Sequence, residues 1–194
     1  MIRVDLTHCE TLEEFYPLIR EQHDDFHGKD YCAIHDVVRK LMKEEGVDKY
    51  KELGVNQGGT AANACLLNPK KIELIDHKLE QYNVYEHLFK DYCEKNNIEL
   101  VSRELDSASV KSRSQCDLLL IDSLHKPSHL IKELNIHAEW TSKYIVCHDT
   151  YRSLGQINTA LHDVLEGFCK QINSWEIIEK NTDNVGYTVI AKGI

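Results

Sequence analysis

The chain has 194 residues, a length that suits one α/β domain with a full hydrophobic core better than two small domains. Its formal net charge is −9, from 23 Lys and Arg against 32 Asp and Glu, so the basic surface that neutralises nucleic-acid phosphates is not expected. We therefore expect a small molecule or a sugar as the ligand and no nucleic-acid partner. A homo-oligomer is compatible with this composition.

The cysteine pattern and the length of the apolar segments indicate the type of compartment in which the protein is expected. The 7 cysteines are scattered and include no C-x-x-C pair, which is typical of free thiols in a reducing compartment. No apolar segment approaches the roughly 20 residues that span a bilayer, and the N-terminus lacks a signal-peptide pattern. We expect a soluble, cytoplasmic protein without a membrane partner.

Two helices are predicted at the N-terminus. Thr11 and Glu14 have the spacing of a capping box, so a helix should begin there and run to about Glu21. A second helix is predicted from Tyr31, because apolar residues recur at helical spacing as far as Gly46. Those residues are Ile34, Val37, Val38, Leu41 and Met42.

Two histidines, His23 and His27, lie between these helices with acidic residues between them. On a helix, a spacing of four would place both imidazoles on one face, where they could hold a metal ion. The alternative is a solvated polar turn that ends at Gly28. The sequence leaves both interpretations open.

A glycine-rich turn stands at the centre of the pattern. Residues 50–55 read as a short buried strand, residues 54–59 as a tight turn and residues 60–67 as an alanine-rich helix. This strand, turn and helix form the first unit of a nucleotide-binding α/β sheet. Glycine is needed where a ligand approaches the backbone or where φ is positive.

The spacing in this turn excludes two common nucleotide motifs. A dinucleotide fingerprint requires G-x-G-x-x-G, whereas this turn offers G-x-x-x-G-G with an acid, Glu52, before it. A P-loop requires Lys followed by Ser or Thr after its last glycine, and here Thr60 and Ala61 follow. The turn is therefore not built for NAD or for a triphosphate.

The next strands bring two further acids to the sheet edge. A strand over residues 71–75 ends at Asp76, which is placed to accept hydrogen bonds from both hydroxyls of a ribose or to cap a helix. One long amphipathic helix is predicted over residues 79–95 and a strand over residues 98–102. Asp106 follows, before a short serine-rich helix that it could cap.

Two central strands end in polar residues. Residues 116–121 form a continuous apolar run, which is typical of a parallel strand buried on both faces, and Asp122 and His125 follow it. A strand over residues 143–147 ends in His148 and Asp149. Because the carboxyl ends of parallel strands open into one crevice, these side chains should face the glycine turn.

The C-terminal part completes the pattern with a helix over residues 156–168 and two strands over residues 175–180 and 186–191. Asn-Thr-Asp-Asn joins these two strands, which indicates an antiparallel hairpin. No internal repeat or Pro/Ser linker interrupts the series.

Three motifs carry a family resemblance that spans roughly residues 48–192. Glu-Leu-Gly-Val-Asn-Gln-Gly-Gly-Thr, Ile-Asp-x-x-His and His-Asp-Thr together resemble class I S-adenosylmethionine-dependent methyltransferases, in particular a branch of small O-methyltransferases. The resemblance implies a Rossmann-like α/β fold with a seven-stranded, mostly parallel sheet and an antiparallel C-terminal hairpin. It also implies a single domain, in which residues 1–46 form a helical cap that shapes the acceptor pocket and residues 47–194 bind the cofactor.

The resemblance implies a cofactor site for S-adenosyl-L-methionine. In the family, the acid before the turn contacts the methionine part, and a residue after the third strand contacts adenine, which here corresponds to Asp106. The implied cofactor-binding residues are Glu52, Gly54, Asn56, Gln57, Gly58, Gly59, Asp76, His77, Asp106, Ser107 and Asp122.

The resemblance also implies a divalent-metal site, with Mg²⁺ or Mn²⁺ held by Asp122, His148 and Asp149 and with His125 as the general base. His148 stands where the family often has a carboxylate, which leaves room for manganese, iron, zinc or no metal. Without a metal, His125 or His148 would act alone as the base, or Asp149 would only cap a helix. A further alternative is a protein that binds S-adenosylmethionine without transferase activity, as a regulatory partner or complex subunit.

Overall fold

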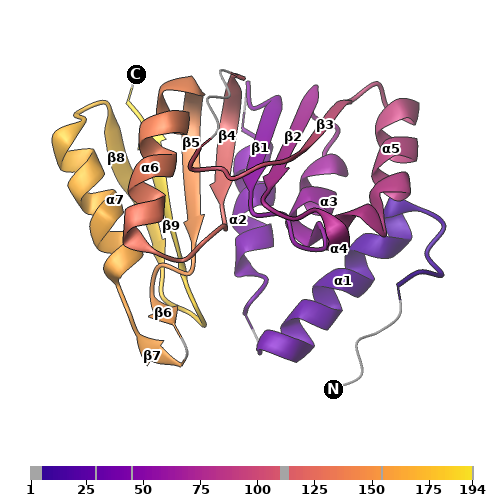
Figure 1. The fold of residues 1–194 in the computed structure, drawn as a ribbon, viewed down its shortest axis with the longest axis horizontal. Coiled ribbons are helices and arrows are strands. Elements are labelled where there is room, and N and C mark those ends of the chain that lie inside the picture. The colour runs from indigo at the N-terminus through magenta and orange to yellow at the C-terminus, as the bar shows by residue number, and fades with distance from the viewer. Residues whose placement is uncertain (1–5, 29, 45, 110–113, 154, 194) are drawn as a thin grey trace.

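The computed structural model describes residues 6–28, 30–44, 46–109, 114–153 and 155–193. Its centre is a seven-stranded sheet with the order β3-β2-β1-β4-β5-β9-β8 (Figure 1). The strands are β1 (Lys49–Leu53), β2 (Lys71–Asp76), β3 (Glu99–Glu104), β4 (Cys116–Ile121), β5 (Thr141–His148), β8 (Trp175–Asn181) and β9 (Tyr187–Lys192). Only β9 runs against the others, because it pairs antiparallel with both β5 and β8. The predicted sheet, including its terminal hairpin, is confirmed.

The strand order reverses between β1 and β4. β1 pairs with β2 on one side and with β4 on the other, and both pairs are parallel. In sheets of this kind, ligands bind outside the carboxyl ends of the strands at such a switch point. Gly54 directly follows β1 and Asp122 directly follows β4, so the topology places these two residues at that edge.

The sheet is buried on both faces, which explains why every residue of β4 except Asp117 is apolar. Leu118 and Leu120 belong to one hydrophobic cluster, whereas Leu119 and Ile121 belong to a second cluster on the opposite face. Successive side chains of a strand point to opposite faces, so alternate residues of β4 fill the hydrophobic clusters on the two faces of the sheet. All of β4 except the half-buried Asp117 is therefore shielded from water.

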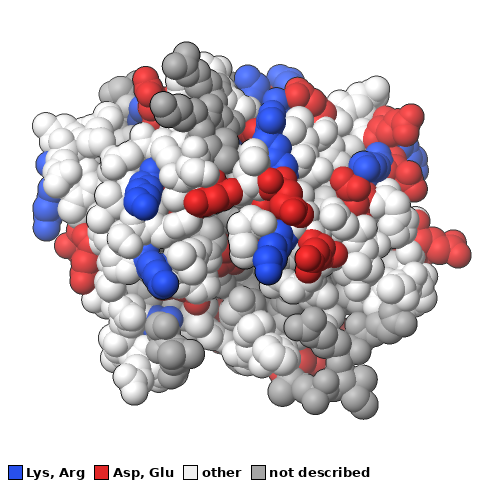
Figure 2. Space-filling view, in the orientation of Figure 1, with Lys and Arg blue, Asp and Glu red and all other residues white. Residues whose placement is uncertain are grey.

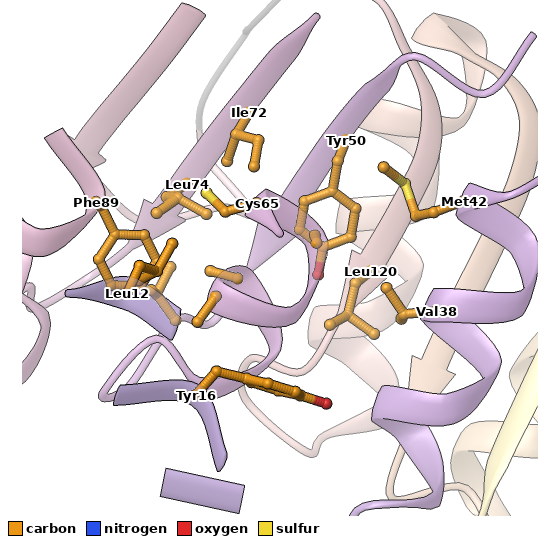
Figure 3. Close-up of a cluster of buried hydrophobic side chains, with 14 of the residues drawn as sticks. Leu12, Tyr16, Val38, Met42, Tyr50, Cys65, Ile72, Leu74, Phe89 and Leu120 are labelled. Atoms are coloured by element: carbon orange, nitrogen blue, oxygen red, sulfur yellow. The ribbon is translucent and has the colours of Figure 1, made fainter. Parts of the chain in front are cut away.

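Helices cover the two faces as separate layers. α1 (Leu12–His27), α2 (Ala33–Met42), α3 (Gly59–Cys65) and α5 (Glu86–Lys95) contribute to the first cluster, and α6 (Pro127–His137) and α7 (Ala160–Gln171) contribute to the second. Figure 3 shows part of the first cluster, with Val38 and Met42 from α2 beside Leu120 and Tyr50 of the sheet and Leu12 from α1 beside Phe89 of α5. The N-terminal helices are therefore part of the core.

α1 begins as predicted but ends later. The Thr11 hydroxyl accepts the backbone N–H of Glu14 at 3.2 Å, as a capping residue should, although the Glu14 carboxylate accepts the N–H of Glu10 instead of that of Thr11. The helix continues past Glu21 to His27 and stops at Gly28, whose φ is +96°. His23 therefore lies on a helix, and the predicted polar turn is wrong.

Two other helix boundaries differ from the sequence prediction. The segment predicted as one helix over residues 79–95 is α4 (Glu80–Asn83) followed by α5, with a break that turns Tyr85 into the core against Phe15, ring centroids 4.8 Å apart. α7 begins at Ala160, because residues 156–157 form β7, which pairs with β6 (Arg152–Ser153). Ile157 contributed to the predicted helical pattern, yet it is exposed in β7. A short 3₁₀ helix, η1 (Ala138–Trp140), connects α6 to β5.

The surface is mixed in charge. On the face in Figure 2, Lys and Arg side chains lie singly among Asp and Glu side chains over the described part of the chain. Several of them form exposed ion pairs, for example Lys70 with Asp48 and Lys71 with Glu99. No helix among the described residues is long and apolar enough to cross a bilayer.

Candidate functional site

The glycine turn after β1 follows a path that only glycine adopts easily. Gly54 and Gly58 have φ values of +88° and +87°. A Cβ on Gly54 would collide with the carbonyl oxygen of Asp122, and a Cβ on Gly58 would lie 2.8 Å from the Phe89 ring. The expectation of positive φ is confirmed. The atoms that a Cβ would meet at these two positions belong to the protein itself, so the fold alone requires glycine there.

Asp76 is the residue that fixes this turn. One of its carboxylate oxygens accepts the backbone N–H groups of Val55 and Asn56 at 2.7 and 3.2 Å. The other accepts the N–H of Lys78 at 3.0 Å and lies 3.0 Å from Nδ1 of His77. Asp76 therefore joins the end of β2 to the turn after β1, and a ribose would have to share its oxygens with these donors.

A cavity of about 540 Å³ opens beside Asp76 at the carboxyl ends of β1, β2 and β4. Its volume falls within the roughly 300–1,000 Å³ typical of small-molecule sites. It is lined by Gly54, Asn56, Ile75, Asp76, His77, Asp106, Ser107, Asp122, Ser123, Leu124 and His129. Seven of the residues predicted to bind the cofactor are therefore brought together here. Asp106 also accepts the N–H of Ala108 at 2.9 Å in a turn, while part of the short helix that it was predicted to cap, residues 110–113, lies outside the described residues.

A buried carboxyl behind this cavity organises part of its wall. Glu133 of α6 is fully buried and accepts the hydroxyls of Ser107 and Ser123 at 2.5 and 2.6 Å. His129 lies 3.3 Å from the same oxygen. Burial raises the pKa of Glu133 above its ordinary value. Sequence reasoning missed this residue, since a glutamate inside an amphipathic helix carries no sign that it is buried.

A second cavity of about 240 Å³ adjoins the first, and Gly54, Asn56, Asp122 and Ser123 line both. The smaller cavity is more polar. Its other lining residues are His23, Tyr31, Ile34, His35, Glu52, Val55, Gly59, Thr60, His125 and His148. Of the residues predicted to bind the cofactor, Gln57 and Gly58 line neither of these two cavities.

Glu52 is a buried carboxyl in the wall of the smaller cavity. It accepts a hydrogen bond from the Tyr50 hydroxyl at 2.6 Å, and the residue is only 2% exposed. Burial raises its pKa well above the ordinary value, and the negative charges of Asp122 and Asp76 raise it further. A cationic ligand at this junction would relieve that repulsion.

The four predicted catalytic and metal-binding residues form one cluster at the ends of β4 and β5. The His125 Nε2 lies 2.9 Å from Asp149 and 3.3 Å from Asp122. The His148 Nδ1 lies 3.2 Å from Asp122 and 3.5 Å from Asp149. Asp149 has a φ of +54°, a left-handed conformation that costs a non-glycine residue about 1–2 kcal/mol. Such strain is often found at functional sites.

Carboxylates and imidazole rings lie next to one another in this cluster, and each shifts the pKa of its neighbours. Hydrogen bonds with Asp122 and Asp149 raise the pKa of His125 to about 10. Burial alone would lower the pKa of His148, but the charges of Asp122 and Asp149 raise it overall. Burial alone would raise the pKa of Asp122, but His148 and His125 hold it well below its ordinary value. In this arrangement His125 is protonated at neutral pH and cannot accept a proton until it loses one.

The donor set of this cluster suits a divalent cation. One ligand atom each from Asp122, His148 and Asp149 lies within 4.8 Å of the others. Two carboxylates and one imidazole accommodate manganese or iron as well as magnesium. The His125 ring stands between the two carboxylates, so an ion held there would compete with its positive charge.

The N-terminal helices supply residues to the smaller cavity that sequence reasoning left out of the site. Tyr31 packs against His148 with ring centroids 5.3 Å apart, and His27 stacks on Tyr31 at 4.1 Å. His35 is buried and lies 3.4 Å from the Thr60 hydroxyl. The histidines from His23 to His35 were visible in the sequence. Whether their side chains face the cavity depends on how α1 and α2 pack on α3, which the sequence does not specify.

Fold and site together define the class to which this architecture belongs. A sheet of this order with a C-terminal hairpin, a glycine turn after β1 and an acid at the end of β2 is the class I methyltransferase fold. No protein-family model and no curated protein matches the sequence.

Solved structures with this fold are numerous, and three illustrate the likeness. One from Staphylococcus aureus, provisionally assigned as a caffeoyl-CoA O-methyltransferase, is 14% identical with a TM-score of 0.68 over 95% of this chain and 93% of that one. The SAH-bound methyltransferase PaMTH1 of Podospora anserina is 13% identical, with a TM-score of 0.66 over 96% and 89%. The O-methyltransferase TomG of Streptomyces achromogenes, in complex with SAM, is 12% identical, with a TM-score of 0.62 over 96% and 91%. At these identities the likeness establishes the fold.

Proposed function

We propose that the protein is an S-adenosylmethionine-dependent methyltransferase that methylates a hydroxyl oxygen of a small molecule or sugar. The observation that carries this proposal is the junction of the two cavities, because Gly54 and Asp122 line both. A larger cavity for the cofactor and a smaller one for the acceptor would thus meet at the ends of β1 and β4. Structural neighbours that are O-methyltransferases support the same class of reaction.

The larger cavity fits the adenosine part of the cofactor. Asp76 and His77, which line it, would bind the ribose hydroxyls, and Asp106 and Ser107 would contact the adenine. The methionine part would extend past Gly54 toward Glu52 in the smaller cavity. The three carboxyls Glu52, Asp76 and Asp122 repel one another across this junction, which favours a ligand that carries positive charge there.

The remaining proposed cofactor contacts lie in the glycine turn itself. Asn56 lines both cavities and Gly59 lines the smaller one, so both can meet the ligand directly. Gln57 and Gly58 would act through the path of the turn, since their positions shape its backbone.

The smaller cavity fits an acceptor of modest size with polar groups. When bound, S-adenosylmethionine supplies a methyl group on a sulfonium sulfur, and an acceptor hydroxyl must lie in line with it and lose its proton. His125, His148 and Asp149 form the cluster that can orient this hydroxyl and take up the proton. Residues 1–46 would act as a cap, because His23, Tyr31 and His35 close one side of the cavity.

A divalent ion, Mg²⁺ or Mn²⁺, is proposed to assist this step. Asp122, His148 and Asp149 would hold it, and it would bind the acceptor oxygen and lower that oxygen's pKa. His125 would then serve as the base, since an ion on the two carboxylates would draw them away from its ring. The observation that supports an ion is the convergence of three ligand atoms beside the acceptor cavity.

Methyl transfer from isotopically labelled S-adenosylmethionine to a panel of hydroxylated small molecules tests the function. Parallel reactions should contain chelator, chelator followed by Mg²⁺, and chelator followed by Mn²⁺. Product that depends on the ion supports the full proposal, and product that survives chelation supports a base that acts without a metal. Cofactor binding without product from any acceptor would favour a binding protein, and absence of cofactor binding would overturn the proposal.

A further inference from the structure

A second group of metal-ligating side chains lies at the smaller cavity, which His23 and His35 line. It consists of His23 from α1, Cys32 at the start of α2 and His35 in the first turn of α2. One ligand atom from each lies within 4.8 Å of the other two. Among the described residues, this group and the Asp122 group are the two that could hold a metal ion.

The His35 ring has one nitrogen that is available to a ligand. The residue is 1% exposed and its Nδ1 has no hydrogen-bond partner, although a buried ring nitrogen normally has one. Its Nε2 lies 3.4 Å from the Thr60 hydroxyl. A proton on Nε2, donated to Thr60, leaves the lone pair on Nδ1, the form in which imidazole binds a metal.

The other two ligands are also held in place. His23 lines the smaller cavity, and its ring packs edge-on against the His35 ring with ring centroids 6.3 Å apart. The Cys32 backbone N–H donates to the Asp24 carboxylate at 3.0 Å, and its thiol donates to the Arg20 carbonyl at 3.5 Å. Cys32 is 1% exposed, so its sulfur faces other protein atoms and not solvent.

We propose that His23, Cys32 and His35 form a zinc site whose fourth coordination position opens into the smaller cavity. Two imidazoles and one thiolate suit Zn²⁺, whereas the carboxylates of the other group suit a harder ion. Tetrahedral zinc ligands lie roughly 3.3–3.8 Å apart, so small side-chain rotations close the site. Zinc enters as the Cys32 thiol loses its proton to solvent, and no redox change is involved.

The position of this site gives it a role at the acceptor cavity. His23 and His35 line that cavity together with Thr60 and Glu52. A three-ligand zinc ion keeps one place for water or for an oxygen of a bound molecule. The ion would also tie α1 to α2 beside the glycine turn, since its ligands come from both helices.

Cobalt substitution of metal-depleted protein tests the site directly. Addition of Co²⁺ should give a thiolate-to-cobalt charge-transfer absorption in the near ultraviolet that saturates at one ion per chain, and Zn²⁺ should displace it. Cys32→Ser should abolish this absorption, and His35→Gln should weaken the binding of Co²⁺ by at least about tenfold. Circular dichroism establishes that each variant is folded.

Two control variants make the test specific. Cys169→Ser alters a half-buried thiol on α7 and should leave the absorption unchanged. Asp149→Asn should also leave it unchanged, because that residue belongs to the other metal group. Absence of the absorption in the unaltered protein, or its persistence in Cys32→Ser, overturns the proposal. The test uses no S-adenosylmethionine and no acceptor, so its outcome is independent of the proposed methyl transfer.

Discussion

The carboxylate of Asp76 accepts the backbone N–H of Val55 at 2.7 Å, so the residue that faces the larger cavity also holds the glycine turn in place. The two roles have different consequences on substitution. Removing the carboxyl releases the turn, whereas removing only its charge keeps an oxygen for the Val55 N–H. A substitution that separates these roles is therefore informative.

Asp76→Asn should weaken the binding of S-adenosylmethionine by roughly 10–100-fold, because hydrogen bonds to a charged group contribute about 1.5–3 kcal/mol. Its thermal midpoint should stay within a few degrees of that of the unaltered protein, while Asp76→Ala should lower both affinity and midpoint. Titration calorimetry and thermal unfolding measure the two effects. Asp91→Asn, which removes one exposed charge on α5, is the control. An unchanged affinity for Asp76→Asn would exclude Asp76 from the cofactor site.

Asp149→Asn should weaken the binding of Mn²⁺ by about tenfold or more, because it removes one of two carboxylates in the proposed ligand group. Electron paramagnetic resonance of free Mn²⁺ gives the affinity without an acceptor. Asp91→Asn again matches the loss of one charge. If Asp149→Asn binds Mn²⁺ as well as the unaltered protein, the contact between His125 and Asp149 is a structural ion pair and the metal proposal fails.

The sequence was most informative where apolar runs end in polar residues. The strand before Asp122 was predicted to the residue, because its buried positions all carry apolar side chains. The acids after β2, β4 and β5 could be assigned to one edge, since parallel strands align their carboxyl ends there. This reasoning also located the cluster of Asp122, His125, His148 and Asp149.

The sequence was least informative where tertiary packing decides the outcome. The histidines His23 and His35 face the smaller cavity only because α1 and α2 pack on α3, and helical spacing does not specify that contact. Likewise Glu133 is buried beneath the larger cavity although its helix is amphipathic. Ile157 fits the apolar spacing of the following helix but lies in β7, because pairing with β6 outweighs its local preference for a helix.

His137 should make the protein less stable in mild acid. Its ring is fully buried, its Nε2 lies 3.0 Å from the Ser107 carbonyl, and burial lowers its pKa. The unfolded chain, with a histidine pKa of about 6.5, therefore binds a proton that the folded protein resists, so the unfolding free energy falls as pH drops below that value. The loss from this residue is at most about 1.4 kcal/mol per pH unit.

Urea unfolding at pH values of about 7.5 and 5.5 measures this effect. His137→Gln keeps a side-chain donor for the Ser107 carbonyl but does not titrate, so its unfolding free energy should fall less between the two pH values. His87→Gln, which removes an exposed histidine from α5, should show the same fall as the unaltered protein. Equal slopes for His137→Gln and the unaltered protein would mean that His137 does not contribute to the pH dependence.

Two glycine substitutions should act in opposite directions. Gly58→Ala puts a Cβ on a residue with φ of +87°, 2.8 Å from the Phe89 ring, and should lower the free energy of unfolding by about 2–4 kcal/mol from left-handed strain and overpacking. Gly167→Ala lies inside α7 with no atom within 4 Å of the new Cβ, and should raise it by about 0.5–1 kcal/mol. Urea unfolding measures both.

Gly58→Ala also shows whether side-chain packing or ligand binding requires a glycine at position 58. If packing decides, Gly58→Ala loses stability in the absence of any ligand, because the Phe89 and Tyr82 rings must move to admit the methyl group. A Gly58→Ala protein that is as stable as the unaltered one, yet binds S-adenosylmethionine more weakly, would contradict this account. The glycine would then be required by the cofactor, and the neighbouring rings would be mobile enough to make room for a side chain.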